Sequence, residues 1–136
     1  MKIGGYDIPL RFSTKAMIDI EELIHGDVEK LSEYIGAEDI TTGTKLKRLA
    51  EIIAILANGH VFTFNQDLEN GLVQGEPKKF YSVDFFLSHL DLNNMNQCMG
   101  DISKEIYNAT DVVVPDNVKL AEEDEVLAEI EEIKNQ

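Results

Sequence analysis

The first twelve residues have the apolar–polar alternation of a β-hairpin. Residues 2–3 and 6–12 flank the pair Gly4-Gly5, and glycine tolerates the positive φ angles of a tight turn. Pro9 lacks a backbone donor, so we expect the second strand to lie at an edge and to pack on the helices that follow. The apolar face of that strand comprises Ile8, Leu10 and Phe12.

Apolar residues at intervals of three and four predict two helices after the hairpin. Ser13 or Thr14 is expected to cap the first, which Gly26 ends. Asp27 is expected to cap a second, shorter helix that ends at Gly36. Each has one apolar face, so both should pack on a common core.

The most apolar helix is expected to run from Thr44 to residue 57, with Asn58-Gly59 as its C-terminal cap. Its stripe places Ile53 near the centre of the core and Lys45, with other charged residues, on the solvent side. Residues 60–81 form the least regular stretch. Residues 61–64 have strand propensity and the remainder is loop-like, so flexibility or function is suspected there.

Two further helices are predicted, one capped by Ser82 and reaching Leu90, the next capped by Asp91 and reaching Asn108. The fold class is therefore mainly α (α+β): a compact helical domain over residues 1–110 with an N-terminal β-hairpin. The predicted core draws on Ile8, Leu10, Phe12, Ile20, Leu23, Leu31, Leu49, Ile53, Leu56, Phe86, Met95, Met99 and Ile102.

Residues 111–136 differ in composition from the domain before them. Residues 112–115 should form an extended connector, because Pro115 disfavours helix at the residue before it. From residue 111 onward nine acidic residues face two lysines, which is half of the net charge. We expect an acidic C-terminal helical arm that docks onto another chain, although folding back onto its own domain remains open. Its candidate partner-binding residues are Leu120, Val126, Leu127, Ile130 and Ile133.

The net charge of the chain argues against two classes of function. The 136 residues include 26 Asp and Glu against 12 Lys and Arg, a formal net charge of −14. Such a chain repels phosphate backbones and anionic lipid surfaces, which argues against nucleic-acid and membrane binding. No apolar run approaches the roughly 20 residues of a membrane span, and the N-terminal segment has no signal-peptide core. A single cysteine fits a reducing cytoplasm.

The sequence contains no catalytic constellation. Its three histidines, His25, His60 and His89, are far apart, and Cys98 lies in an apolar stripe that predicts a buried thiol. Residues 36–45 resemble a phosphate loop only in containing Gly and Lys, and the glycines are too widely spaced. Residues 65–76 resemble a calcium loop in which the glycine or the last ligand is misplaced. We expect no enzyme activity, no cofactor and no metal.

As a whole, the order of elements resembles the tail assembly chaperones of long-tailed bacteriophages and prophages, in the style of those from Gram-positive hosts. The resemblance covers most of residues 1–108 as a pattern. It rests on the opening MKIGGYDIPLRF, the helical KAMIDIEEL of residues 15–23 and the helical LAEIIAILANG of residues 49–59. Residues 60–81 and the acidic C-terminal segment resemble the family less.

The resemblance implies a non-enzymatic protein of the host bacterial cytoplasm that takes part in virion assembly. Such a protein coats the tape-measure protein, and a longer frameshifted form recruits the tail-tube protein; self-association into a homo-oligomer is a further expectation. The alternatives are an acidic DNA mimic that inhibits a nuclease or repressor, and a small enzyme or metal module built on residues 65–76. A DNA mimic should carry carboxylates across its whole surface, whereas half of the charge here lies in the C-terminal segment.

Overall fold

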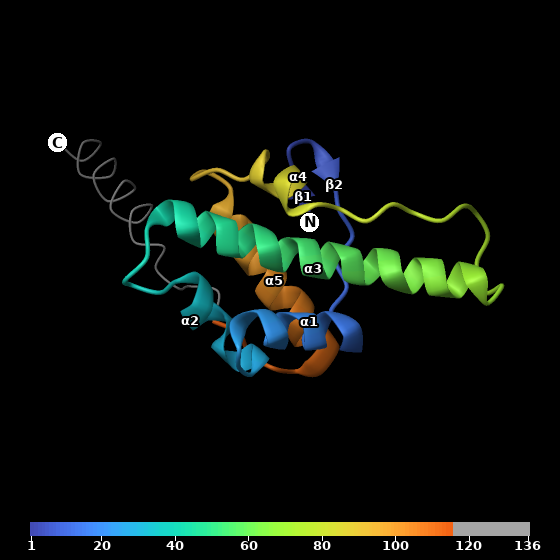
Figure 1. Ribbon diagram of the computed structural model, residues 1–136, viewed down its shortest axis with the longest axis horizontal. Helices are drawn as coiled ribbons and strands as arrows, with labels where there is room; N and C mark the ends of the chain where they lie inside the picture. Colours follow the sequence, from blue (N-terminus) through green and yellow to red (C-terminus); the bar gives the residue numbers. More distant parts are fainter. Residues whose placement is uncertain (116–136) are drawn as a thin grey trace.

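The long helix α3 runs the length of the molecule, and the other elements pack around it (Figure 1). The computed structural model describes residues 1–115. The mainly helical class with a small N-terminal hairpin is confirmed. In chain order the elements are β1 (Lys2–Ile3), β2 (Tyr6–Asp7), α1 (Thr14–Ile24), the 3₁₀ turn η1 (Val28–Lys30), α2 (Leu31–Ile35), α3 (Thr42–Glu69), α4 (Val83–Leu87) and α5 (Met95–Thr110).

The core forms where α1, α2, α4 and α5 meet the first half of α3. In Figure 1, α1 and α2 lie on one side of α3, α4 and the hairpin lie on the other, and α5 crosses it. All thirteen residues predicted for the core belong to this cluster, with Leu10 and Leu23 half-buried at its edge. Their spacing at three and four residues therefore located the buried face of each helix correctly.

The hairpin is shorter than predicted. β2 ends at Asp7, and the segment that follows bonds to the hairpin end and then to helices. The Ile8 N–H donates to the Met1 carbonyl (2.7 Å), and the Arg11 N–H donates to the Leu56 carbonyl of α3 (3.0 Å). The Phe12 N–H donates to Glu105 Oε1 of α5 (3.1 Å). These bonds replace a strand partner, and Ile8 and Phe12 are still buried.

Several helix ends differ from the predicted ones. α4 ends at Leu87 and does not reach Leu90, whereas α5 continues past Asn108 to Thr110. Ser13 caps α1 as expected, but the left-handed residue at its C-terminus is His25, before Gly26. Asp27 stands before η1 without a side-chain capping bond, and the Val28 N–H donates to Glu21 Oε2 (3.2 Å). Asp91 Oδ1 accepts from the N–H groups of Asn93 and Asn94, in a turn that comes before α5. The helix α5 itself begins only at Met95.

The largest correction concerns α3. The expected helix began at Thr44 and ended before Asn58-Gly59, whereas α3 begins at Thr42 and continues to Glu69. Residues 61–64, predicted as a strand, are helical. Lys45 was expected in solvent, yet only 4% of it is exposed, on the core side of α3. Asn58 and Gly59 lie inside the helix, where both contact residues that are distant in the sequence.

The start of the predicted connector belongs to the domain. Residues 111–115 are non-helical, as expected, but Val114 is 3% exposed and packs in the core with Val112 at its edge. The predicted domain boundary at 110 thus precedes a stretch that packs on the domain. The predicted acidic C-terminal helix, beyond residue 115, lies outside the described residues.

Candidate functional site

The second half of α3 projects from the domain and is followed by a segment that returns along it (Figure 1). We call residues 59–80 the arm and the returning residues 72–82 the strap. Gly71, with a φ of +75°, makes the turn between α3 and the strap. The strap has no strand partner in the described structure, so its backbone groups must bond to side chains or water.

Two asparagines of α3 hold the strap. The Asn58 amide accepts from the Tyr81 N–H (2.7 Å) and donates to the Tyr81 carbonyl (2.9 Å). The Asn65 amide accepts from the Lys78 N–H (2.8 Å) and donates to the Lys78 carbonyl (3.0 Å). Each side-chain amide therefore pairs with the backbone as a neighbouring strand would. The four bonds fix the strap along the helix.

The spacing of these asparagines matches the spacing of their partners. Seven residues of α-helix rise about 10.5 Å. Three residues of extended chain span about 10 Å. Asn58 and Asn65 lie on one face of α3, so they meet residues 81 and 78 in antiparallel order.

Gly59 allows the chain before α1 to lie directly against α3. A Cβ atom at Gly59 would lie 2.4 Å from the Arg11 carbonyl oxygen and 3.3 Å from the Ala16 Cβ. Any side chain there would displace this backbone, whose neighbouring N–H bonds to α3. Gly59 therefore serves close packing inside the helix, and it does not end the helix.

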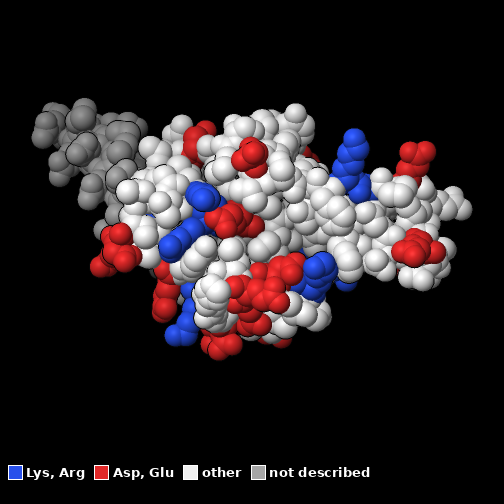
Figure 2. All heavy atoms as spheres, viewed as in Figure 1, with Lys and Arg blue, Asp and Glu red and all other residues white. Residues whose placement is uncertain are grey.

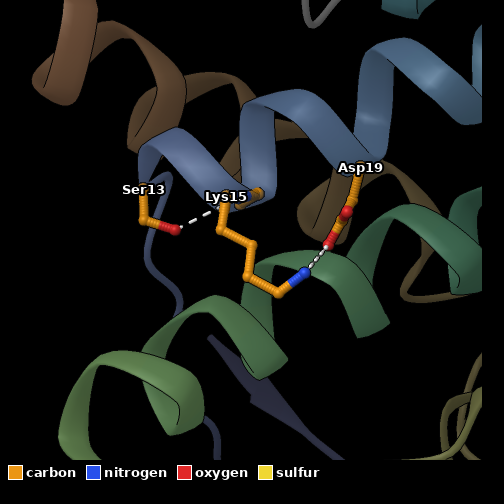
Figure 3. Close-up of polar contacts among 4 residues, drawn as sticks. Ser13, Lys15 and Asp19 are labelled. Carbon is orange, nitrogen blue, oxygen red and sulfur yellow. Dashed lines mark hydrogen bonds and ion pairs between the residues drawn. The ribbon is translucent and has the colours of Figure 1, made fainter. Parts of the chain in front are cut away.

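A groove of about 220 Å³ lies where α1, α3 and the strap meet. Its apolar floor and sides include Ala16, Ile55 and Phe62, with Phe80 of the strap at the rim. Lys15 and Asp19 point toward each other over α3, with a distance of 3.2 Å between Nζ and Oδ2 (Figure 3). The groove is thus lined by apolar and polar side chains together, and the Lys15–Asp19 ion pair is part of its lining.

Two apolar side chains of the strap face solvent. Phe80 is 59% exposed, and Leu72, near the end of the arm, is 75% exposed. Two lysines stack on aromatic rings of the arm: Lys15 Nζ lies 5.6 Å from the Phe62 centroid, and Lys78 Nζ lies 4.5 Å from that of Phe64. The aromatic rings and the two lysines together form an apolar surface that carries positive charge. We call Phe62, Leu72 and Phe80, with the groove, the arm face.

The charges are unevenly spread over the visible side of the molecule. Figure 2 shows acidic side chains gathered over α1, while the arm carries both signs. His60, on α3 at the base of the arm, has a pKa below its ordinary value. Burial is the main cause, and the charges of Lys78 and Arg11 contribute. His60 is therefore neutral at pH 7, and it adds no positive charge to the arm.

The residues with potential chemistry do not form a site. Cys98 is fully buried, and burial, with the Asp101 carboxylate, raises its pKa to about 11. Within residues 1–115, no three His, Cys, Asp or Glu side chains are grouped closely enough to hold a metal ion. The calcium-loop resemblance is wrong in its geometry, because residues 65–69 are helical. The phosphate-loop resemblance also lacks its loop, because Gly43 through Lys45 lie in the first turns of α3.

The five partner-binding residues predicted from the sequence lie outside the described residues: Leu120, Val126, Leu127, Ile130 and Ile133. The arm face was not predicted, although residues 60–81 were suspected of a function. A usable signal existed in Asn58, Phe62 and Asn65, which share one face of a continuous helix at intervals of four and three.

Comparisons with models of protein families, with curated proteins and with solved structures found no match for this chain. Among the helices of residues 1–115, none is both long enough and apolar enough to cross a membrane.

Proposed function

We propose that this chain is a non-enzymatic assembly chaperone of long-tailed phages or prophages. It would coat the tape-measure protein in the cytoplasm of the host bacterium. A longer frameshifted form would help to recruit the tail-tube protein. The observation that carries the proposal is the arm face, where Phe80 exposes apolar surface at a groove that could receive a side chain of a partner helix, and where Leu72 is exposed near the end of the arm.

Two further properties support this role. A hairpin that passes directly into a helix, followed by a long apolar helix, is the pattern on which the family resemblance rests. A protein that covers an aggregation-prone helical chain needs apolar surface of its own, and it needs net charge to keep the complex dissolved. The chain has a formal net charge of −14, and acidic side chains gather over α1, whose Asp19 is part of the groove lining.

Binding at the arm face would follow the helix-in-groove mode. A partner helix places apolar residues on one face at intervals of three and four, and one of them could enter the groove between Ala16 and Phe62. Leu72 and Phe80 would cover its neighbours. Burying one large apolar side chain contributes about 1.5–3 kcal/mol, which is about 10- to 100-fold in affinity.

The test is co-expression with the long tape-measure protein that the proposal expects to be encoded downstream of this gene; the solubility of that protein and its co-purification with this chain are measured. The wild-type chain should keep that protein in solution and co-purify with it. Phe80→Asp and Leu72→Asp should reduce co-purification about tenfold or more. Leu92→Asp is the matched control, because Leu92 is also exposed and apolar but lies between α4 and α5.

Equal binding by Phe80→Asp and Leu92→Asp would exclude the arm face as the contact. A complete lack of binding by the wild-type chain, together with salt-dependent competition against DNA for a nuclease, would favour the DNA-mimic alternative. At the genomic level, the proposal expects a slippery heptamer near the 3′ end of the gene and an overlapping reading frame.

A further inference from the structure

A second groove, of about 640 Å³, follows the outer face of α5. Gly100, Lys104 and Tyr107 recur along it at intervals of four and three, so they lie on one side of the helix. Tyr107 is 49% exposed and Val113 is 70% exposed. The opposite wall is formed by residues 113–115. The groove thus combines apolar surface with one lysine.

The described chain ends inside this groove. Val114 is buried in the core, which fixes the path of the backbone, and Pro115 is the last lining residue. Residue 116 therefore begins at the groove itself. The residues from 116 to 136 are numerous enough to follow α5 in either direction, since each extended residue spans about 3.3 Å.

The composition of that segment complements the groove. Residues 116–136 contain eight acidic residues and two lysines, and Lys104 is the charged residue of the groove lining.

We propose that residues 116–136 dock into the α5 groove of their own chain. Their apolar positions would cover Tyr107 and Val113, and their carboxylates would face Lys104. A tethered segment has an effective concentration in the millimolar range, so it occupies its own groove before that of a second copy. The inference does not depend on the tape-measure protein, because the arm face is a separate surface. It predicts that the apolar groove is covered in the free protein. The segment's five apolar positions are Leu120, Val126, Leu127, Ile130 and Ile133.

The test uses the full chain with a nitroxide spin label. Ile130→Cys in a Cys98→Ala background places one label in the segment, and NMR records the relaxation of backbone amides in ¹⁵N-labelled protein. Docking should broaden the amides of Lys104 and Tyr107 strongly, while those of residues in the arm remain sharp. A label that broadens no amide of α5 would overturn the proposal.

A mixed sample separates the same chain from a second copy. Spin-labelled chains without ¹⁵N are combined with ¹⁵N-labelled chains without the nitroxide, so only contacts between copies cause broadening. The proposal expects sharp α5 amides in this sample. Broadening here that equals the single-chain effect would show that the groove receives a second copy, which overturns docking in cis.

Charge variants test the ionic part. Lys104→Glu should reduce the broadening at Tyr107 several-fold, and the loss should be smaller at high salt, where the attraction is screened. Lys47→Glu is the matched control, since Lys47 is an exposed lysine of α3 outside the groove. Equal broadening in the two variants would overturn the role of Lys104.

Discussion

Gly59 has a different role in the structure from the one that its neighbours in the sequence suggest. In the sequence it follows Asn58 and resembles a helix cap, whereas in the structure it lies inside α3 against the Arg11 carbonyl. A helix-breaking residue is tolerated at this point because the close approach it allows is used for packing and for the Arg11–Leu56 hydrogen bond.

Gly59→Ala should therefore destabilise the protein by about 1–3 kcal/mol, because the new methyl group must displace backbone. Gly43→Ala is the matched control. Its Cβ atom would meet nothing closer than 3.9 Å, in the first turn of the same helix, so alanine should be neutral or stabilising by up to about 1 kcal/mol. Urea unfolding measures both, and equal stability of the two variants would contradict the packing role of Gly59.

Cys98 gives a second prediction at the residue scale. Its thiol is buried and its pKa is raised to about 11, so little thiolate exists at neutral pH. A thiol reagent at pH 8 should react at least about 100-fold more slowly with the folded protein than with protein unfolded in urea. Rapid labelling without denaturant would show that Cys98 is accessible.

The raised pKa of Cys98 makes the free energy of unfolding depend on pH. In the unfolded chain the thiol ionises near pH 9, whereas in the folded protein it stays protonated to about pH 11. The unfolded state therefore loses its proton first, so the free energy of unfolding should fall as pH rises from about 9 through 11. Urea titrations across this range should show a smaller fall for Cys98→Ala, which lacks the group. If the wild type and Cys98→Ala lose stability equally across this range, ionisation of Cys98 does not contribute to the fall.

At the scale of elements, the strap depends on side chains for its position. An amide can donate and accept at once, which an aspartate or alanine cannot do. Asn65→Asp keeps the acceptor for the Lys78 N–H but loses the donor, and Asn65→Ala loses both. Asn65→Ala should consequently loosen the strap more than Asn65→Asp does.

We expect Asn65→Ala to lower stability by about 0.5–1.5 kcal/mol per hydrogen bond lost. Hydrogen exchange should show faster exchange of the Lys78 amide, with a smaller increase for Asn65→Asp. Asn70→Ala is the control, because the Asn70 side chain bonds to the Gln66 carbonyl within the helix. Unchanged exchange at Lys78 in Asn65→Ala would mean that the strap is held by other contacts.

The sequence predicted some of these elements and not others, for physical reasons. The buried faces of the helices follow from local spacing, so residues such as Ile20, Leu49 and Ile102 were assigned correctly. The continuation of α3 depends on contacts between residues far apart in the chain, such as Asn58 with Tyr81. The strand propensity of residues 61–64 was overridden by this packing. The groove at the arm arises from three separate segments, so the shared helix face of Asn58, Phe62 and Asn65 indicates only the part that α3 contributes.

At the scale of the whole molecule, the first half of α3 is the centre of the core. Ile53 is fully buried among residues of several helices. Ile53→Asp should prevent stable folding, since it places an unpaired charge in an apolar interior. Ile18→Asp should melt like the wild type, because Ile18 is about half exposed on α1. Circular dichroism during heating measures both, and a normal cooperative transition for Ile53→Asp would show that α3 is not central.

The two asparagine pairs also bear on how the arm could vary in length. Asn65 and Lys78 are in contact, so residues 66–77 leave the domain and return to it at one place. Removing or inserting whole turns there, with matching residues in the strap, would change how far the arm extends without moving the core. Chain ends that already meet tolerate such changes well. Related proteins could therefore adjust their reach by length alone, and this position is a natural place to insert a tag or reporter.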